Sequence, residues 1–186
     1  MPPDLLLEPK SARSESPTVT PGSGDKATLA AGIGAVAVVT LFLWIIHDRY
    51  LPIMENWFSS YGQLMHDGKL PYRDFYFFTQ PLSLLISWAV YGINDKMIYL
   101  RYFGFLERVC LTGALYFLIS RRFSPVASFW ATVLPMLFFL AYCSEAFFTY
   151  LVTCCLFFTL SLIFLELAFE KRGASNRFLF WAGFAA

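Results

Sequence analysis

The sequence predicts an all-α integral membrane protein with about four transmembrane helices and the start of a fifth. Hydrophobic residues make up 58% of the 186 positions and charged residues only 15%, whereas soluble domains are about a quarter charged. Apolar runs of membrane length recur along the chain, and dense basic segments separate some of them. The net charge of +1 gives no basis for expecting nucleic acid as a partner.

The chain divides into a tail and a membrane domain. Residues 1–26 are rich in Pro, Ser and Thr and lack apolar periodicity, which predicts a disordered cytoplasmic tail. Residues 27–186 form the membrane domain, in which four runs approach the roughly 20 residues that a span needs: Ala27–Ile46, Met97–Ser120, Ser124–Tyr142 and Ala146–Phe169.

Two further apolar segments are too short to span. Leu82–Ile93 is of a length more typical of interfacial helices, so we expect it to lie along the outer membrane surface. Phe178–Ala186 is about half a span, from which we expect the chain to be the N-terminal part of a longer membrane protein.

The positive-inside rule decides between two topologies. If Leu82–Ile93 does not span, the basic residues at 121–122 and 171–177 fall on the same face as the N-terminus. We therefore expect a multi-pass protein of the bacterial inner, or plasma, membrane with a cytoplasmic N-terminus. Its external loop then covers residues 47–96, and Glu145 shares the outer face.

Within this loop, the first stretch predicts an amphipathic helix that ends at Gly68. Its apolar residues recur at helical spacing, and Glu55 is expected on the opposite, polar side with Asn56 and Ser59. The apolar set comprises Met54, Trp57, Phe58, Tyr61, Leu64 and Met65.

Three charged residues on the outer face are candidates for chemistry. Glu55 is either a general base or an ordinary first-turn acid that complements the helix dipole. Glu145 has a similar pair of interpretations, as a site acid or a solvated loop residue. Arg101 either binds a phosphate or is a snorkelling membrane anchor. His47 and His66 are isolated and the four cysteines lie in apolar runs, so no metal site is predicted.

The external loop resembles that of a known enzyme family. The residues that carry the resemblance are Glu55, Trp57, the YGQLM run at 61–65, the GKLPYRDF run at 68–75 and QPL at 80–82. Leu100-Arg101, Arg121-Arg122-Phe123 and Ala182-Gly183-Phe184 extend it. The pattern is similar to polytopic GT-C glycosyltransferases of the protein-mannosyltransferase and aminoarabinose-transferase-like group, which use a polyprenyl-phosphate sugar.

This resemblance implies an inverting transfer of a sugar from a lipid-linked donor to an acceptor hydroxyl at the outer membrane face. It assigns Glu55 as the base, Glu145 as a second acid and Arg101 as a contact of the donor phosphate. Tyr72, Arg73 and Asp74 are expected to shape the loop. Many relatives carry an acidic pair where this chain has Met54-Glu55.

The expected partners are the lipid-linked sugar donor and membrane lipids, and the acceptor is left undefined. No cofactor is assigned, and assistance by a divalent metal stays an open alternative. The alternative function is a non-catalytic membrane subunit or a fragment of a transporter, for which Glu107 and Arg108 within a span are the one sequence feature.

Overall fold

A computed structural model describes residues 24–47, 53–77, 81–142 and 148–170, together with 181 and 183. All named elements in these ranges are helices, and the prediction of an all-α chain is confirmed for them. The helices are α1 (Gly24–Ile46), α2 (Ile53–His66), α3 (Pro81–Ile93), α4 (Met97–Ser120), α5 (Pro125–Tyr142) and α6 (Tyr150–Glu170).

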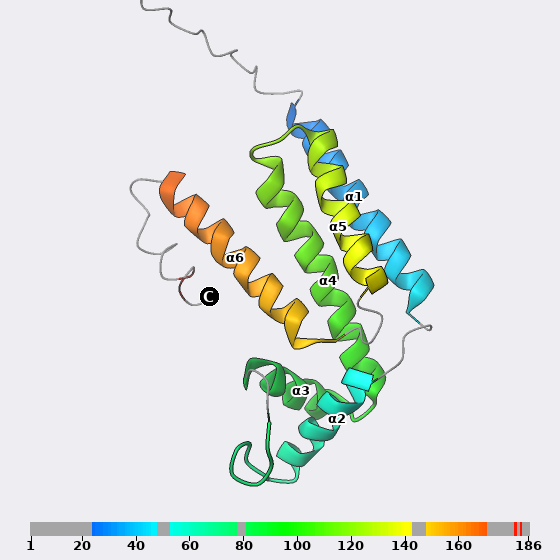
Figure 1. Ribbon diagram of the computed structural model, residues 1–186, viewed down its shortest axis with the longest axis vertical. Coiled ribbons are helices and arrows are strands. Elements are labelled where there is room, and N and C mark those ends of the chain that lie inside the picture. Colours follow the sequence, from blue (N-terminus) through cyan, green and yellow to red (C-terminus); the bar gives the residue numbers. More distant parts are fainter. Residues whose placement is uncertain are drawn as a thin grey trace, which may run out of the picture.

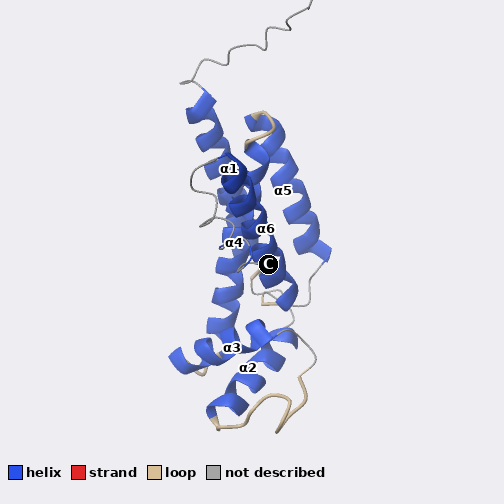
Figure 2. Ribbon diagram, turned by 90° about the vertical axis from the view of Figure 1, so that its left-hand side faces the viewer, coloured by secondary structure: helices blue, strands red, loops and turns tan. Residues whose placement is uncertain are grey.

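The four long helices run alongside one another, and α2 and α3 lie together at one end of them (Figures 1 and 2). By length and composition, three helices can cross a membrane: Asp25–Ile46 of α1, the whole of α4, and Tyr150–Phe169 of α6. Shorter apolar stretches occupy α3 and Pro125–Phe138 of α5. A membrane protein with three candidate spans therefore follows from the described residues.

α1 packs closely against α4 at one glycine. A Cβ atom at Gly32 would lie 2.7 Å from the ring of Tyr116, so only glycine allows this approach without a shift of the ring. Tyr116 also donates a hydrogen bond from its hydroxyl to the carbonyl oxygen of Thr28, at 2.6 Å. Further along the bundle, side chains from α1, α4, α5 and α6 pack into one hydrophobic core. Its buried residues are Val39, Leu43, Leu111, Met136 and Val152.

α4 and α6 are joined through polar side chains as well as apolar ones. Glu107 and Arg108 are 4% and 1% exposed, so these two charges of the α4 span face the protein interior. Thr153 of α6 donates its hydroxyl to Glu107 Oε1 at 2.8 Å. Just after the C-terminal end of α4, Arg122 forms an ion pair with Glu166 at 3.1 Å. The α4–α5 turn therefore lies beside the C-terminal half of α6.

α2 and α3 form one interlocked unit. A Cβ atom at Gly62 would stand 2.9 Å from the carbonyl oxygen of Ser87, and the Ser87 hydroxyl donates to the carbonyl oxygen of Phe58. Phe58 belongs to an aromatic-rich core with Phe77, Leu84, Leu100 and Phe148, which fixes the unit on the first turns of α4.

Several predicted boundaries shift. α1 begins at Gly24, so the last three residues of the predicted tail, 24–26, are helical; residues 1–23 lie outside the described range. α6 begins at Tyr150 rather than at residue 146. Gly68 does end the helical segment, with φ of +80°, a conformation that glycine adopts at little cost.

Candidate functional site

Glu55 lies in the first turn of α2 and is fully buried, with an exposed fraction of 0%. The prediction that it occupies the polar side of α2 is therefore wrong. Glu55, Phe58 and Gly62 follow one another at the spacing of a single helix stripe, and that stripe faces the protein. Trp57, expected on the buried side, is instead 49% exposed.

The structure brings Glu55 together with Arg101, the second predicted site residue. Arg101 Nε lies 3.9 Å from Glu55 Oε1, and the two side chains are 12% and 0% exposed. This separation is an ion-pair distance and is too long for a hydrogen bond. The pair joins the start of α2 to the second turn of α4, which are far apart in the sequence.

Arg101 also holds the end of the α1 segment. Its Nη1 donates a hydrogen bond to the carbonyl oxygen of His47, at 3.0 Å, and the His47 ring stacks on Trp44 with centroids 4.9 Å apart. Sequence reasoning did not assign His47 to the site. The contact uses the backbone oxygen of His47, which every residue type has, so the sequence could not predict it. The three-residue spacing of Trp44 and His47 does predict that the two rings lie on one helix face.

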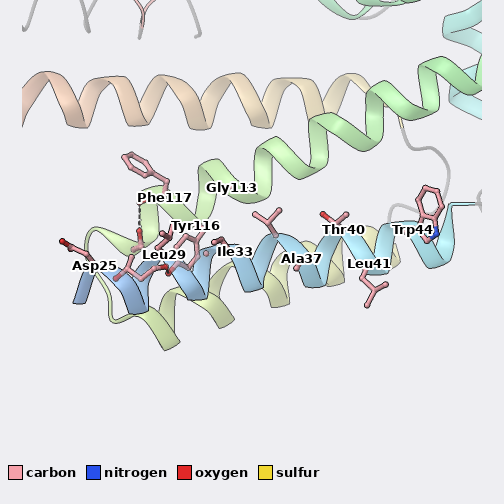
Figure 3. A pocket seen from close by; sticks show the side chains of 14 residues that line it. Asp25, Leu29, Ile33, Ala37, Thr40, Leu41, Trp44, Gly113, Tyr116 and Phe117 are labelled. Atoms are coloured by element: carbon pink, nitrogen blue, oxygen red, sulfur yellow. Dashed lines mark hydrogen bonds between the residues drawn. The ribbon is translucent and has the colours of Figure 1, made fainter. Parts of the chain in front are cut away.

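A long apolar groove runs between α1 and α4 (Figure 3). Its volume is about 900 Å³, and it extends along α1 from Asp25 to Trp44. At a rise of 1.5 Å per residue this corresponds to about 29 Å, close to the hydrocarbon thickness of a bilayer. The wall on α4 is formed by Gly113, Tyr116, Phe117 and Ser120.

A smaller cavity of about 140 Å³ lies at the Trp44 end, next to the ion pair. Trp44 belongs to both the groove and this cavity, whose other lining residues are His47, Arg101, Tyr102 and Phe105. An apolar chain in the groove would therefore reach Trp44, which also borders the cavity that Arg101 lines. This is the arrangement that an amphiphile with an anionic head requires.

The predicted loop-shaping residues form a compact turn after α2. Pro71 and Phe75 bridge, Tyr72 adopts a positive φ of 63°, and its amide donates to the carbonyl oxygen of Phe75 at 2.9 Å. Asp74 accepts from the Leu70 amide at 2.8 Å and from Arg73 Nη2 at 2.7 Å. The Arg73 guanidinium and then the Leu70 amide lower the pKa of Asp74 from 3.8 to about 2.

This turn and the ion pair lie at opposite ends of α2, because Glu55 begins the helix and the turn follows His66. Glu145, the second predicted acid, lies outside the described residues. Among the described side chains, no three His, Cys, Asp or Glu residues gather in a way that could hold a metal ion. The site thus consists of one carboxylate, one guanidinium and an apolar groove.

No protein-family model matches the chain, and neither a curated protein nor a solved structure does. The assignment of function therefore depends on the chemistry of the site and on the loop pattern.

Proposed function

We propose that this chain is a GT-C-like membrane glycosyltransferase that moves a sugar from a polyprenyl-phosphate donor to an acceptor hydroxyl at the outer membrane face. The observation that supports this most is the pairing of Glu55 and Arg101, because Arg101 lines the small cavity that meets the α1–α4 groove at Trp44. A base and a phosphate-binding cation are the two charged groups that such a transfer needs.

In the proposed reaction, the acceptor oxygen attacks the anomeric carbon of the sugar while the bond from that carbon to the phosphate oxygen breaks. Glu55 takes the proton of the acceptor hydroxyl, and the leaving polyprenyl phosphate keeps the electron pair of the broken bond. Arg101 stabilises the negative charge on this phosphate. Glu145 serves as the supporting acid, and Tyr72, Arg73 and Asp74 hold the shape of the external loop.

The proposal includes the GT-C-like membrane arrangement. α5, with 18 residues, makes the fourth crossing, and α3 lies along the outer interface. The N-terminus is cytoplasmic. Cysteines introduced at Lys69 and Ser124 should then react with an impermeant reagent from opposite sides of the membrane, as should cysteines at Ser144 and Gly173. Labelling of either pair from one side contradicts this topology.

Transfer is tested in membranes that contain the protein, with a polyprenyl-phosphate sugar as donor. Glu55→Gln should reduce the rate by at least about 100-fold, because general-base catalysis contributes on that scale. Asp67→Asn is the matched control, since it removes an exposed carboxylate from the same helical unit. An unchanged rate in Glu55→Gln excludes Glu55 as the base.

A transporter component is the second candidate, and Glu107 is the observation that favours it. Its carboxyl is buried inside the α4 span, and intramembrane acids commonly mark ion or substrate pathways. Glu107→Gln keeps a group that can accept from Thr153, so the glycosyltransferase proposal expects transfer to survive it. A substrate flux that depends on Glu107 would favour the transporter.

A further inference from the structure

We propose that the Glu55–Arg101 pair is a latch that a lipid-linked phosphate opens, so that the donor must bind before the acceptor. This inference rests on the proposed function and adds an order of binding to it. In the described structure Glu55 is 0% exposed. A carboxylate in that state cannot meet an acceptor hydroxyl, so a step that uncovers it must precede catalysis.

The geometry of Arg101 identifies what opens the latch. Its guanidinium holds two elements at once, the Glu55 carboxylate at 3.9 Å and the His47 carbonyl oxygen at 3.0 Å. The ionic contact is the longer of the two and lies beyond hydrogen-bond distance. A phosphate oxygen presents a charge and a geometry that match the planar guanidinium fork, so it competes with Glu55 for the same group.

The bound phosphate displaces the Glu55 carboxylate from Arg101 because the two anions repel each other. A phosphate seated on Arg101 places a second negative charge beside a carboxylate that is withdrawn from water, and this arrangement is unfavourable. The Glu55 side chain must then turn away from Arg101, toward the water-facing side of the loop. Binding of the donor thereby exposes the base.

The groove determines the chemical class of the ligand. Trp44 lines both the cavity at Arg101 and the α1–α4 groove, and the other wall residues of the cavity are His47, Tyr102 and Phe105. A phosphate attached to a long apolar chain is held in the bilayer beside this route and so reaches Arg101 at a high local concentration, whereas inorganic phosphate is not. The ligand of the latch is thus a lipid phosphate monoester or diester.

The latch predicts an effect on phosphate affinity that would not follow if Glu55 simply contributed to binding. If Glu55 competes with phosphate, removing its charge must strengthen phosphate binding. Glu55→Gln should bind polyprenyl phosphate about 5-fold more tightly than the unaltered protein, a coupling at the lower end of the usual range. Asp67→Asn, which alters an exposed acid at the other end of α2, should bind like the unaltered protein.

The experiment uses the full chain in phosphatidylcholine nanodiscs and three probes: polyprenyl phosphate, polyprenol without phosphate, and inorganic phosphate in the buffer. Binding is followed by native mass spectrometry. In parallel, a water-soluble carbodiimide with an amine labels accessible carboxylates in the unaltered protein, and peptide mapping reads Glu55. Polyprenyl phosphate should increase labelling of Glu55 several-fold, while labelling of the exposed Asp67 stays constant.

Equal or weaker binding of polyprenyl phosphate by Glu55→Gln overturns the latch, and so does unchanged labelling of Glu55 in the unaltered protein. An equal response to polyprenol removes the role of the phosphate, and an equal response to inorganic phosphate removes the role of the lipid chain. None of these measurements involves a sugar or an acceptor. Failure of the latch therefore leaves the transfer assay to decide the proposed function separately.

Discussion

Among the described residues, an arginine–carboxylate pair in the turn after α2 and another between α2 and α4 differ in almost every physical respect. Arg73 and Asp74 are neighbours in the sequence, lie 2.7 Å apart and stand at the surface. Arg101 and Glu55 come from different helices, lie 3.9 Å apart and are almost wholly buried. The shorter contact is in the more exposed pair.

Distance alone therefore misjudges which pair matters. An exposed pair between adjacent residues exchanges one set of hydrogen bonds for another in water, and its contribution to stability is small. A buried pair is costly to assemble, but removing one member leaves the other charge in a poor environment. We therefore expect the longer, buried pair to matter more for folding and for the proposed transfer than the shorter, exposed pair.

Removal of the guanidinium tests this contrast most strongly. Arg101→Gln removes the guanidinium that lies 3.9 Å from the buried carboxylate of Glu55, and we expect the free energy of unfolding to fall by about 3 kcal/mol. The measurement is denaturant or thermal unfolding in a detergent micelle. Arg73→Gln is the matched control and should leave the unfolding midpoint unchanged, and equal effects of the two substitutions would contradict the contrast.

The burial of Glu55 also depends on how α2 seats against α3. Gly62→Val forces side-chain atoms against the backbone carbonyl of Ser87, which a Cβ alone would approach to 2.9 Å. Overpacking of this kind costs about 2 kcal/mol, and we expect Glu55 to become more accessible to carbodiimide labelling. Gly113→Ala is the control, because a Cβ there meets no atom within 4 Å; it should leave labelling unchanged and should not lower stability, since alanine favours a helix more than glycine does.

The sequence predicted some of these features and missed others for identifiable reasons. The bounds of α4, Met97–Ser120, agree with the prediction because polar or charged segments flank a single long apolar run. The end of α2, two residues before Gly68, was also predictable from the sequence, since a glycine followed by Pro71 signals a helix terminus. Both are local features of composition.

The burial of Glu55 depends on contacts with a distant part of the chain, so local sequence features could not predict it. Periodicity assigned faces of α2 by polarity, whereas the buried stripe of α2 contains an acid because Arg101 of α4 lies opposite it. Trp57 remains exposed on the same helix, and periodicity alone does not tell an apolar side chain on the protein surface from one in the core. The carbonyl oxygen of His47 completes the site, and a backbone atom leaves no mark in the residue pattern.

Loss of the Asp74 charge should have a small and local effect. Asp74→Asn keeps an oxygen that can accept from the Leu70 amide but removes the ionic contact with Arg73. We expect at most about a 2-fold change in transfer, in keeping with the small contribution of exposed pairs, and no change in the unfolding midpoint. A decrease as large as that expected for Glu55→Gln would place Asp74 in the chemistry rather than in the support of the loop.

The pH dependence of the turn follows from the same residue. Hydrogen bonds from Arg73 and Leu70 lower the pKa of Asp74 from 3.8 to about 2 in the folded chain. A carboxylate with a lowered pKa stabilises its turn fully above its unfolded pKa, and this contribution is lost as the pH falls from 3.8 through about 2. The Leu70 amide resonance in isotope-labelled protein should therefore stay near its neutral-pH position at pH 4 and shift at lower pH, with a midpoint near the lowered pKa. In Asp74→Asn that titration should disappear. A midpoint at the ordinary value of 3.8 in the unaltered protein would mean that Arg73 and the amide do not hold the carboxylate in solution.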